Sequence, residues 1–125
     1  MSGRKLTLKK FKMINAGDAS QATVTSSVID IQFMDNIGIQ ANIVSGTPTG
    51  SFQVQVSADH SEVNGNVEVA GNWVDLTGAV QAITSGSPAQ TYFDLNQLSA
   101  PYVRLVYTRS SGTGVIEAFA TGKMV

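Results

Sequence analysis

Alternation of apolar and polar residues with a period of two runs through most of this 125-residue chain. The segment SFQVQVS (51–57) places Phe52, Val54 and Val56 on one face and glutamines on the other. Because successive side chains of a strand point to opposite sides of a sheet, this pattern indicates a strand with one buried face. The same pattern occurs in residues 28–34 (with one break in phase), 37–44, 102–109 and 115–121.

No segment shows a convincing helical period, and residues 94–100 predict at most one helical turn before Pro101. Turn sequences rich in Gly, Pro, Asn and Asp separate the predicted strands, and SSGTG (110–114) is the clearest hairpin. Parallel sheets would need crossover helices, which the chain does not offer. We therefore expect an all-β fold, an antiparallel β-sandwich or jelly roll of about seven to nine short strands.

Charge is divided unevenly along the chain, although the net charge is only −1. Residues 1–12 hold five cations and no acid, whereas the rest holds three cations and nine acids, a net charge of −6. We predict a basic arm or edge strand over 1–12 and a sandwich domain over 13–125. In an edge strand, the lysines would discourage pairing with the edges of other molecules and so protect against aggregation. A free arm would instead bind an acidic protein or, as the less favoured alternative, a nucleic acid. The predicted partner-binding residues are Arg4, Lys5, Lys9, Lys10, Phe11 and Lys12.

The chain offers little catalytic chemistry. It has no cysteine and one histidine, His60, in the polar segment SADHSEVNGN, where we expect a solvated side chain. Asp59, Glu62 and two asparagines surround Gly65 in an order that does not match a calcium loop, and we interpret them as a polar hairpin loop. The only tryptophan, Trp73, is expected in the core, with a surface-binding role beside His60 as the alternative. We predict no enzyme, no metal and no cofactor.

Three runs carry a resemblance to known proteins: GSFQVQVSAD (50–59), NWVDLTG (72–78) and FDLNQLSAPYVRLVYTRSSGTGVIEAFATGK (93–123). Together they resemble a group of small virion proteins of tailed bacteriophages. The residues that carry the resemblance are Gly50, Ser57, Asp59, Trp73, Pro101, Tyr102, Arg104, Tyr107, Gly112, Gly114 and Lys123. The chain departs from the group in an insertion, HSEVNGNVEVAG (60–71). The resemblance implies a structural protein of the phage particle and does not decide between head and tail.

Within the third run, Gly112 and Gly114 are predicted to supply a turn and Tyr107 to face the core. Arg104 lies on the opposite face, in a region poor in cations, and we predict that it pairs with a carboxylate.

Our leading hypothesis is a capsid decoration or cement protein that bridges neighbouring subunits of the head as a dimer or trimer. It would be made in the host cytoplasm and reside in the virion, its partners being the major capsid protein or other virion proteins. We predict no nucleic-acid partner and no membrane partner, since no apolar run approaches the ~18 residues of a membrane span. The alternatives are a tail, neck or baseplate protein, or a carbohydrate- or receptor-binding module that uses Trp73 or residues 58–72.

Overall fold

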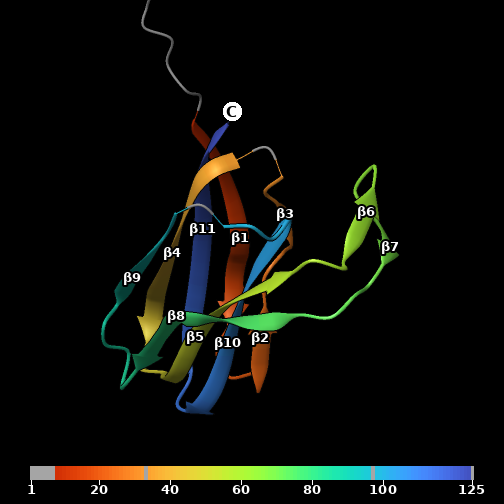
Figure 1. The fold of residues 1–125 in the computed structure, drawn as a ribbon. Coiled ribbons are helices and arrows are strands. Elements are labelled where there is room, and N and C mark those ends of the chain that lie inside the picture. The colour runs from red at the N-terminus through yellow and green to blue at the C-terminus, as the bar shows by residue number, and fades with distance from the viewer. Residues whose placement is uncertain (1–7, 33, 97, 125) are drawn as a thin grey trace, which may run out of the picture.

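Two antiparallel β-sheets pack face to face in the computed structural model, which describes residues 8–32, 34–96 and 98–124 (Figure 1). The side chains of Leu8, Lys9, Asp35, Asn96 and Met124 are outside this description. The described residues contain strands, turns and bends but no helix, so none of them forms a helix that could cross a membrane. The predicted all-β sandwich is confirmed.

The four-stranded sheet has the order β1–β11–β4–β9. Its strands are β1 (Leu8–Asp18), β11 (Gly114–Met124), β4 (Met34–Gly46) and β9 (Gln90–Asn96). Leu8 pairs with Lys123 and Lys12 pairs with Phe119, so residues 8–12 belong to the edge strand β1 and are not a free arm. Arg4 and Lys5 lie outside the described residues.

The five-stranded sheet has the order β2–β10–β5–β8, with β3 also paired to β10. Its strands are β2 (Thr23–Thr25), β3 (Ile29–Asp30), β5 (Thr49–Ser57), β8 (Val74–Ile83) and β10 (Tyr102–Ser111). A separate hairpin of β6 (Ser61–Val63) and β7 (Asn66–Val69) stands away from the sandwich (Figure 1). Its turn residues, Asn64 and Gly65, both have positive φ, as a tight hairpin turn requires. The predicted polar hairpin loop is therefore a defined β-hairpin.

The core lies between the two sheets and follows the period-two pattern of the sequence. The inward residues of the five-stranded sheet are mostly large, whereas the buried ones of β4 and β11 are Ile and Ala, so large side chains face small ones across the interface. The fully buried side chains at the centre of this interface are Ile39, Phe52, Val54, Val103, Leu105, Tyr107, Ile116, Ala118 and Ala120. The inward placement of Tyr107 is confirmed, and its ring lies 5.0 Å from that of Phe52.

Two predicted elements are wrong. Residues 28–34 do not form one strand: β3 belongs to the five-stranded sheet, and β4, which begins at Met34, belongs to the other. The break in phase within this segment marks the passage of the chain between sheets. The helical turn allowed for 94–100 is absent as well, because residues 94–96 complete β9 and those described after them are not helical.

Gly112, in the turn between β10 and β11, is required for two reasons. Its φ is +76°, and a β-carbon there would lie 2.6 Å from the carbonyl oxygen of Thr47. Gly114 has no positive φ, but a β-carbon there would overlap the carbonyl oxygen of Ser45. The predicted turn role holds for Gly112, whereas Gly114 permits a close approach between strands.

We predict that Gly112→Ala lowers the free energy of unfolding clearly more than Gly78→Ala. Gly78 is a matched control because its φ is +84° and no atom lies within 4 Å of a β-carbon there. Gly78→Ala should lower the free energy of unfolding by about 1–2 kcal/mol, because of backbone strain alone. In Gly112→Ala the overlap with Thr47 should lower it further. Urea unfolding measures both. Equal losses would show that the contact with Thr47 relaxes freely.

Candidate interaction site

The base of the β6–β7 hairpin sits on the outer face of the five-stranded sheet and gathers residues from three segments. Ser57, at the end of β5, leads into the hairpin; Trp73 follows it; and Tyr102 and Arg104 face outward from β10. These segments are brought together by the pairing of β10 with β5 (Tyr102 with Ser57) and of β5 with β8 (Gln55 with Asp75).

A carboxylate clamp closes the base of the hairpin. Asp59 accepts hydrogen bonds from the backbone N–H of Asn72 (2.7 Å), the side-chain amide of Asn72 (2.9 Å) and the hydroxyl of Ser57 (3.0 Å). These bonds, the Asn72 backbone bond first, hold the pKa of Asp59 below its ordinary value. Gly71 completes the closure, since its φ is +68° and a β-carbon there would lie 2.5 Å from the backbone nitrogen of His60. The clamp joins the two ends of the inserted segment.

His60 is buried, with 6% of its surface exposed, so the prediction of a solvated side chain is wrong. Its ring lies edge-on to Tyr102 (centroids 4.9 Å apart) and 5.3 Å from Trp73. Nδ1 lies 2.9 Å from the carbonyl oxygen of Ala70, and Nε2 lies 2.8 Å from a carboxylate oxygen of Glu62. Both partners only accept hydrogen bonds, so the ring satisfies both when it is the protonated imidazolium. The sequence around His60 is polar and gives no sign of this burial, because the rings that cover it, Trp73 and Tyr102, lie farther along the chain.

Trp73 is partly exposed, and Arg104 stacks on it with the guanidinium carbon 4.4 Å from the ring centroid. The predicted carboxylate partner of Arg104 is wrong: its Nε donates to the side-chain oxygen of Gln55 at 2.8 Å. Gln55 in turn donates to Asp75 at 2.9 Å, so the carboxylate lies one residue further away. Partial burial lowers the pKa of Arg104, and stacking on an aromatic face suits a weakly hydrated guanidinium. Trp73 is therefore neither a core residue nor a free surface ring.

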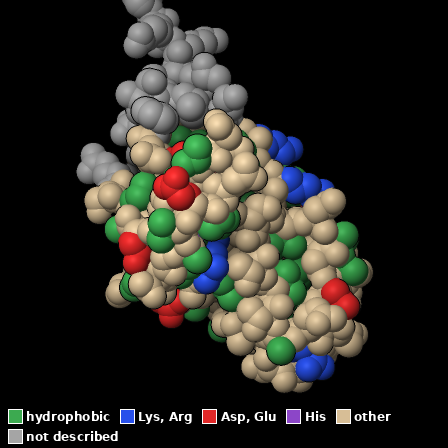
Figure 2. Space-filling view, turned by 90° about the vertical axis from the view of Figure 1, so that its right-hand side faces the viewer, with side chains coloured by type: hydrophobic (Ala, Val, Ile, Leu, Met, Phe, Trp, Pro, Cys, Tyr) green, Lys and Arg blue, Asp and Glu red, His purple; other side chains and the backbone are tan. Residues whose placement is uncertain are grey.

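Beyond this anchored base, the hairpin presents apolar side chains to solvent. Val63, Val67 and Val69 are 51%, 60% and 50% exposed, and Val74, just after the hairpin, is 62% exposed. Figure 2, which views the molecule from the hairpin side, shows hydrophobic side chains at the surface among acidic and polar ones. The alternating sequence EVNGNVEV around an Asn-Gly turn is the signal that could have identified these valines.

The one histidine of the site is buried at its base. Among residues 8–32, 34–96 and 98–124, no group of three or more His, Asp or Glu side chains is placed to hold a metal ion. Both nitrogens of His60 are engaged, and burial separates the ring from solvent. What the site offers is a rigid base and a projecting, partly apolar hairpin.

The other predicted binding residues lie elsewhere. Lys10 and Lys12 face outward from β1, with their ammonium groups 4.9 Å and 5.3 Å from the centroid of Phe119, while Phe11 packs against the core. The side chain of Lys9, like Arg4 and Lys5, is outside the described residues. The hairpin site and the lysines of β1 thus belong to different sheets.

No protein-family model matches this chain, and no curated protein matches it. Among solved structures it is similar to the SPBc2 prophage-derived protein YomS, at 11% identity and a TM-score of 0.59, over 98% of this chain and 97% of that one. Weaker likenesses are to the infectious bursal disease virus Gx strain (10% identity, TM-score 0.48, 97% of this chain and 33% of that one) and to chitosan-binding module 1 of a chitosanase/glucanase from Paenibacillus sp. IK-5 (18% identity, TM-score 0.45, 92% and 93%). At these identities the likeness to YomS shows the fold alone.

We predict that the hairpin base weakens as the pH rises. The hydrogen bond to Glu62, aided by the Ala70 carbonyl, raises the pKa of His60 above its ordinary 6.5, against the opposing effects of burial and of Arg104. The stabilisation is therefore complete below about pH 6.5 and is lost as the pH rises through the folded-state pKa. Melting temperature and Trp73 fluorescence, measured from pH 5 to 9, should both show this transition.

His60→Phe is the matched control, because it keeps a ring between Tyr102 and Trp73 and removes the only histidine in the chain. It should abolish the transition, and Glu62→Gln should move it to lower pH. An unchanged transition in His60→Phe would assign it to another group.

Proposed function

We propose that this chain is a non-enzymatic structural component of a bacteriophage particle, and that it joins neighbouring subunits of the head shell. The observation that carries the proposal is the projecting β6–β7 hairpin, whose three valines are exposed while its base is firmly anchored. An isolated two-stranded hairpin is marginally stable in water, and exposed apolar side chains gathered on one are typical of a binding surface. Figure 1 shows the hairpin projecting from the sandwich, which leaves its side chains open to contact with a neighbouring subunit.

The similarity to a prophage-derived protein over nearly the whole of both chains supports the phage setting of this proposal, together with the resemblance carried by the PYVRLVYTRSSGTG run. The hairpin lies within the insertion that sets this chain apart from the resembling virion proteins. We infer that the sandwich supplies the shared scaffold and that the hairpin supplies contacts particular to this chain.

The charge of the chain supports a protein partner over nucleic acid. Residues 13–125 carry a net charge of −6, which opposes close approach to phosphates. Lys10, Lys12 and Lys123 lie on neighbouring strands of the four-stranded sheet, where they suit an acidic protein surface. We propose that the chain acts in the virion as a dimer or trimer, with the major capsid protein as its principal partner.

We predict that the double variant Val67→Ser/Val69→Ser binds particles at least about tenfold more weakly. Burying the exposed half of a valine contributes about 1 kcal/mol, so two valines contribute about 2 kcal/mol, and every 1.4 kcal/mol changes affinity tenfold. Binding is measured by co-sedimentation with particles that were assembled without this chain. Val44→Ser, at a position 55% exposed, is the control and should bind like the unmodified protein.

Unchanged binding of the double variant would exclude the hairpin as the contact. Quantifying the chain in purified particles then separates the alternatives: several hundred copies fit a head shell, while about six or twelve fit a ring in the neck, tail or baseplate. Absence of the chain from purified particles would overturn the proposed function.

A further inference from the structure

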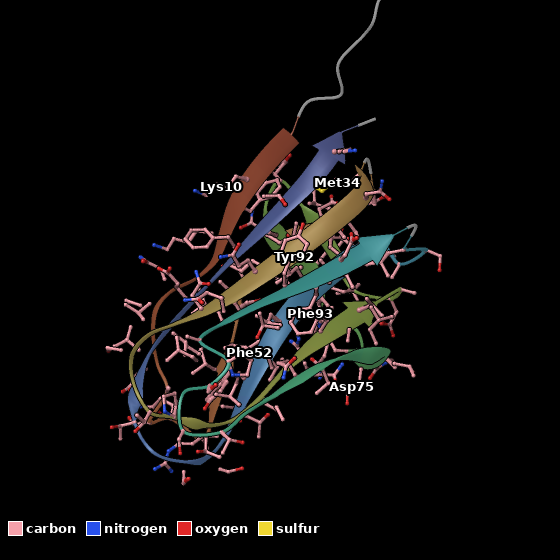
Figure 3. The ribbon with its side chains drawn as sticks, turned by 90° about the vertical axis from the view of Figure 1, so that its left-hand side faces the viewer. Lys10, Met34, Phe52, Asp75, Tyr92 and Phe93 are labelled. Carbon is pink, nitrogen blue, oxygen red and sulfur yellow. The ribbon has the colours of Figure 1, made fainter. Side chains whose placement is uncertain are left out.

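The outer face of the four-stranded sheet carries a second feature, independent of the hairpin. Tyr92, on β9, is 60% exposed, yet its hydroxyl lies directly over Gly38 of the neighbouring strand β4, where a β-carbon would overlap it. Figure 3 shows Tyr92 over the sheet, while the adjacent Phe93 points between the two sheets. Because residue 38 is a glycine, without a β-carbon, the ring can lie against the sheet although it is largely open to solvent.

Tyr92 borders a hollow of about 460 Å³ at the edge of the sandwich, where β8 residues form the other wall. Two further hollows flank Tyr92 on the outer face of the four-stranded sheet, each of about 250 Å³ and each open to solvent. One is lined by Asn36, Asp94, Thr121 and Lys123, and the other by Lys10, Gln40, Asn42 and Phe119, with Thr121 reaching both. Amide, hydroxyl and ammonium groups therefore lie on both sides of one exposed aromatic ring, and a carboxylate lies on one side. Small-ligand sites commonly combine an apolar or aromatic surface with a few such groups.

The polar groups of the second hollow are held in place by one another. Gln40 donates to the side-chain oxygen of Asn42 (3.0 Å), and Asn42 donates to Glu117 (3.0 Å). Phe119 is covered by the ammonium groups of Lys10 and Lys12, so Tyr92 is the ring that remains available for stacking. Preorganised polar side chains reduce the entropy lost when a ligand binds.

We propose that this face binds a neutral oligosaccharide, with one sugar ring stacked on Tyr92 and the hydroxyls of adjoining sugars in the two hollows. A sugar ring has an apolar face that matches an aromatic surface and hydroxyls that match amide and carboxylate groups. The described charges that line or adjoin the two hollows are Lys10, Lys12, Lys123, Asp94 and Glu117, which nearly cancel and so favour a neutral ligand over a polyanion. The site is distinct from the Trp73 region, which lies on the other sheet.

The test is an array of neutral linear oligosaccharides of glucose, galactose, xylose and N-acetylglucosamine, probed with the full chain. Binding to a member of the array is then titrated by NMR, where the amide signals of residues 38–42 and 91–94 should shift. Tyr92→Ala should weaken binding at least tenfold, and Tyr92→Phe should largely retain it because the ring remains. Tyr92 is mostly exposed, so these variants should keep the melting temperature of the unmodified protein.

Trp73→Phe and the hairpin variant Val67→Ser/Val69→Ser are the matched controls on the opposite sheet, and both should bind the sugar normally. Loss of sugar binding in Trp73→Phe with retention in Tyr92→Ala would overturn the proposal, as would no binding on the array at millimolar sugar. Particle binding is measured in a separate experiment. A failure to bind sugar would therefore not count against the proposed role in the particle, and a failure to bind particles would not count against the sugar site.

Discussion

Packing of the two inner sheet faces is the constraint on which the rest of this molecule depends. Phe52, Leu105 and Tyr107 of one sheet are fully buried against a facing sheet whose inward residues include Ala118 and Ala120. Because side chains alternate along a strand, burying this set fixes which residues point outward, and a shift of one residue would exchange the faces. The chemistry available at both outer surfaces is therefore set by the core.

Each outer surface carries one cluster of side chains whose position follows from the packing of the core, although the core does not include it. On the five-stranded sheet, Arg104 alternates with Val103 and Leu105, and its outward direction brings it over Trp73. On the four-stranded sheet, Tyr92 alternates with Phe93, and its outward direction brings it over Gly38. In both places an aromatic ring is kept partly open to solvent among fixed polar partners. This arrangement gives a small sandwich two separate faces for the two proposed interactions.

The sequence predicted the strands well wherever one strand keeps a single phase, as in 37–44, 51–57 and 102–109. It failed at 28–34, where the chain changes sheets and one periodic pattern covers two strands. It also failed for His60, because its covering ring from Tyr102 is 42 positions away and pairing between distant strands leaves no local pattern. For the same reason Arg104 was assigned a carboxylate partner, whereas its partner Gln55 comes from the neighbouring strand. Periodicity reports which face a residue occupies, and only strand order reports its neighbours.

The hairpin illustrates how local and distant interactions combine. Its turn is encoded locally by Asn64 and Gly65, but two paired strands of three and four residues are too short to be stable alone. Its position is instead held by contacts at the base, where Asp59 joins the two ends and His60 links Glu62 and Ala70 to the sheet. A hairpin fixed in this way loses less conformational freedom when a partner binds than a free loop of the same length. The buried ring of His60 therefore rigidifies the proposed contact surface, although it lies beneath the side chains that a partner would touch.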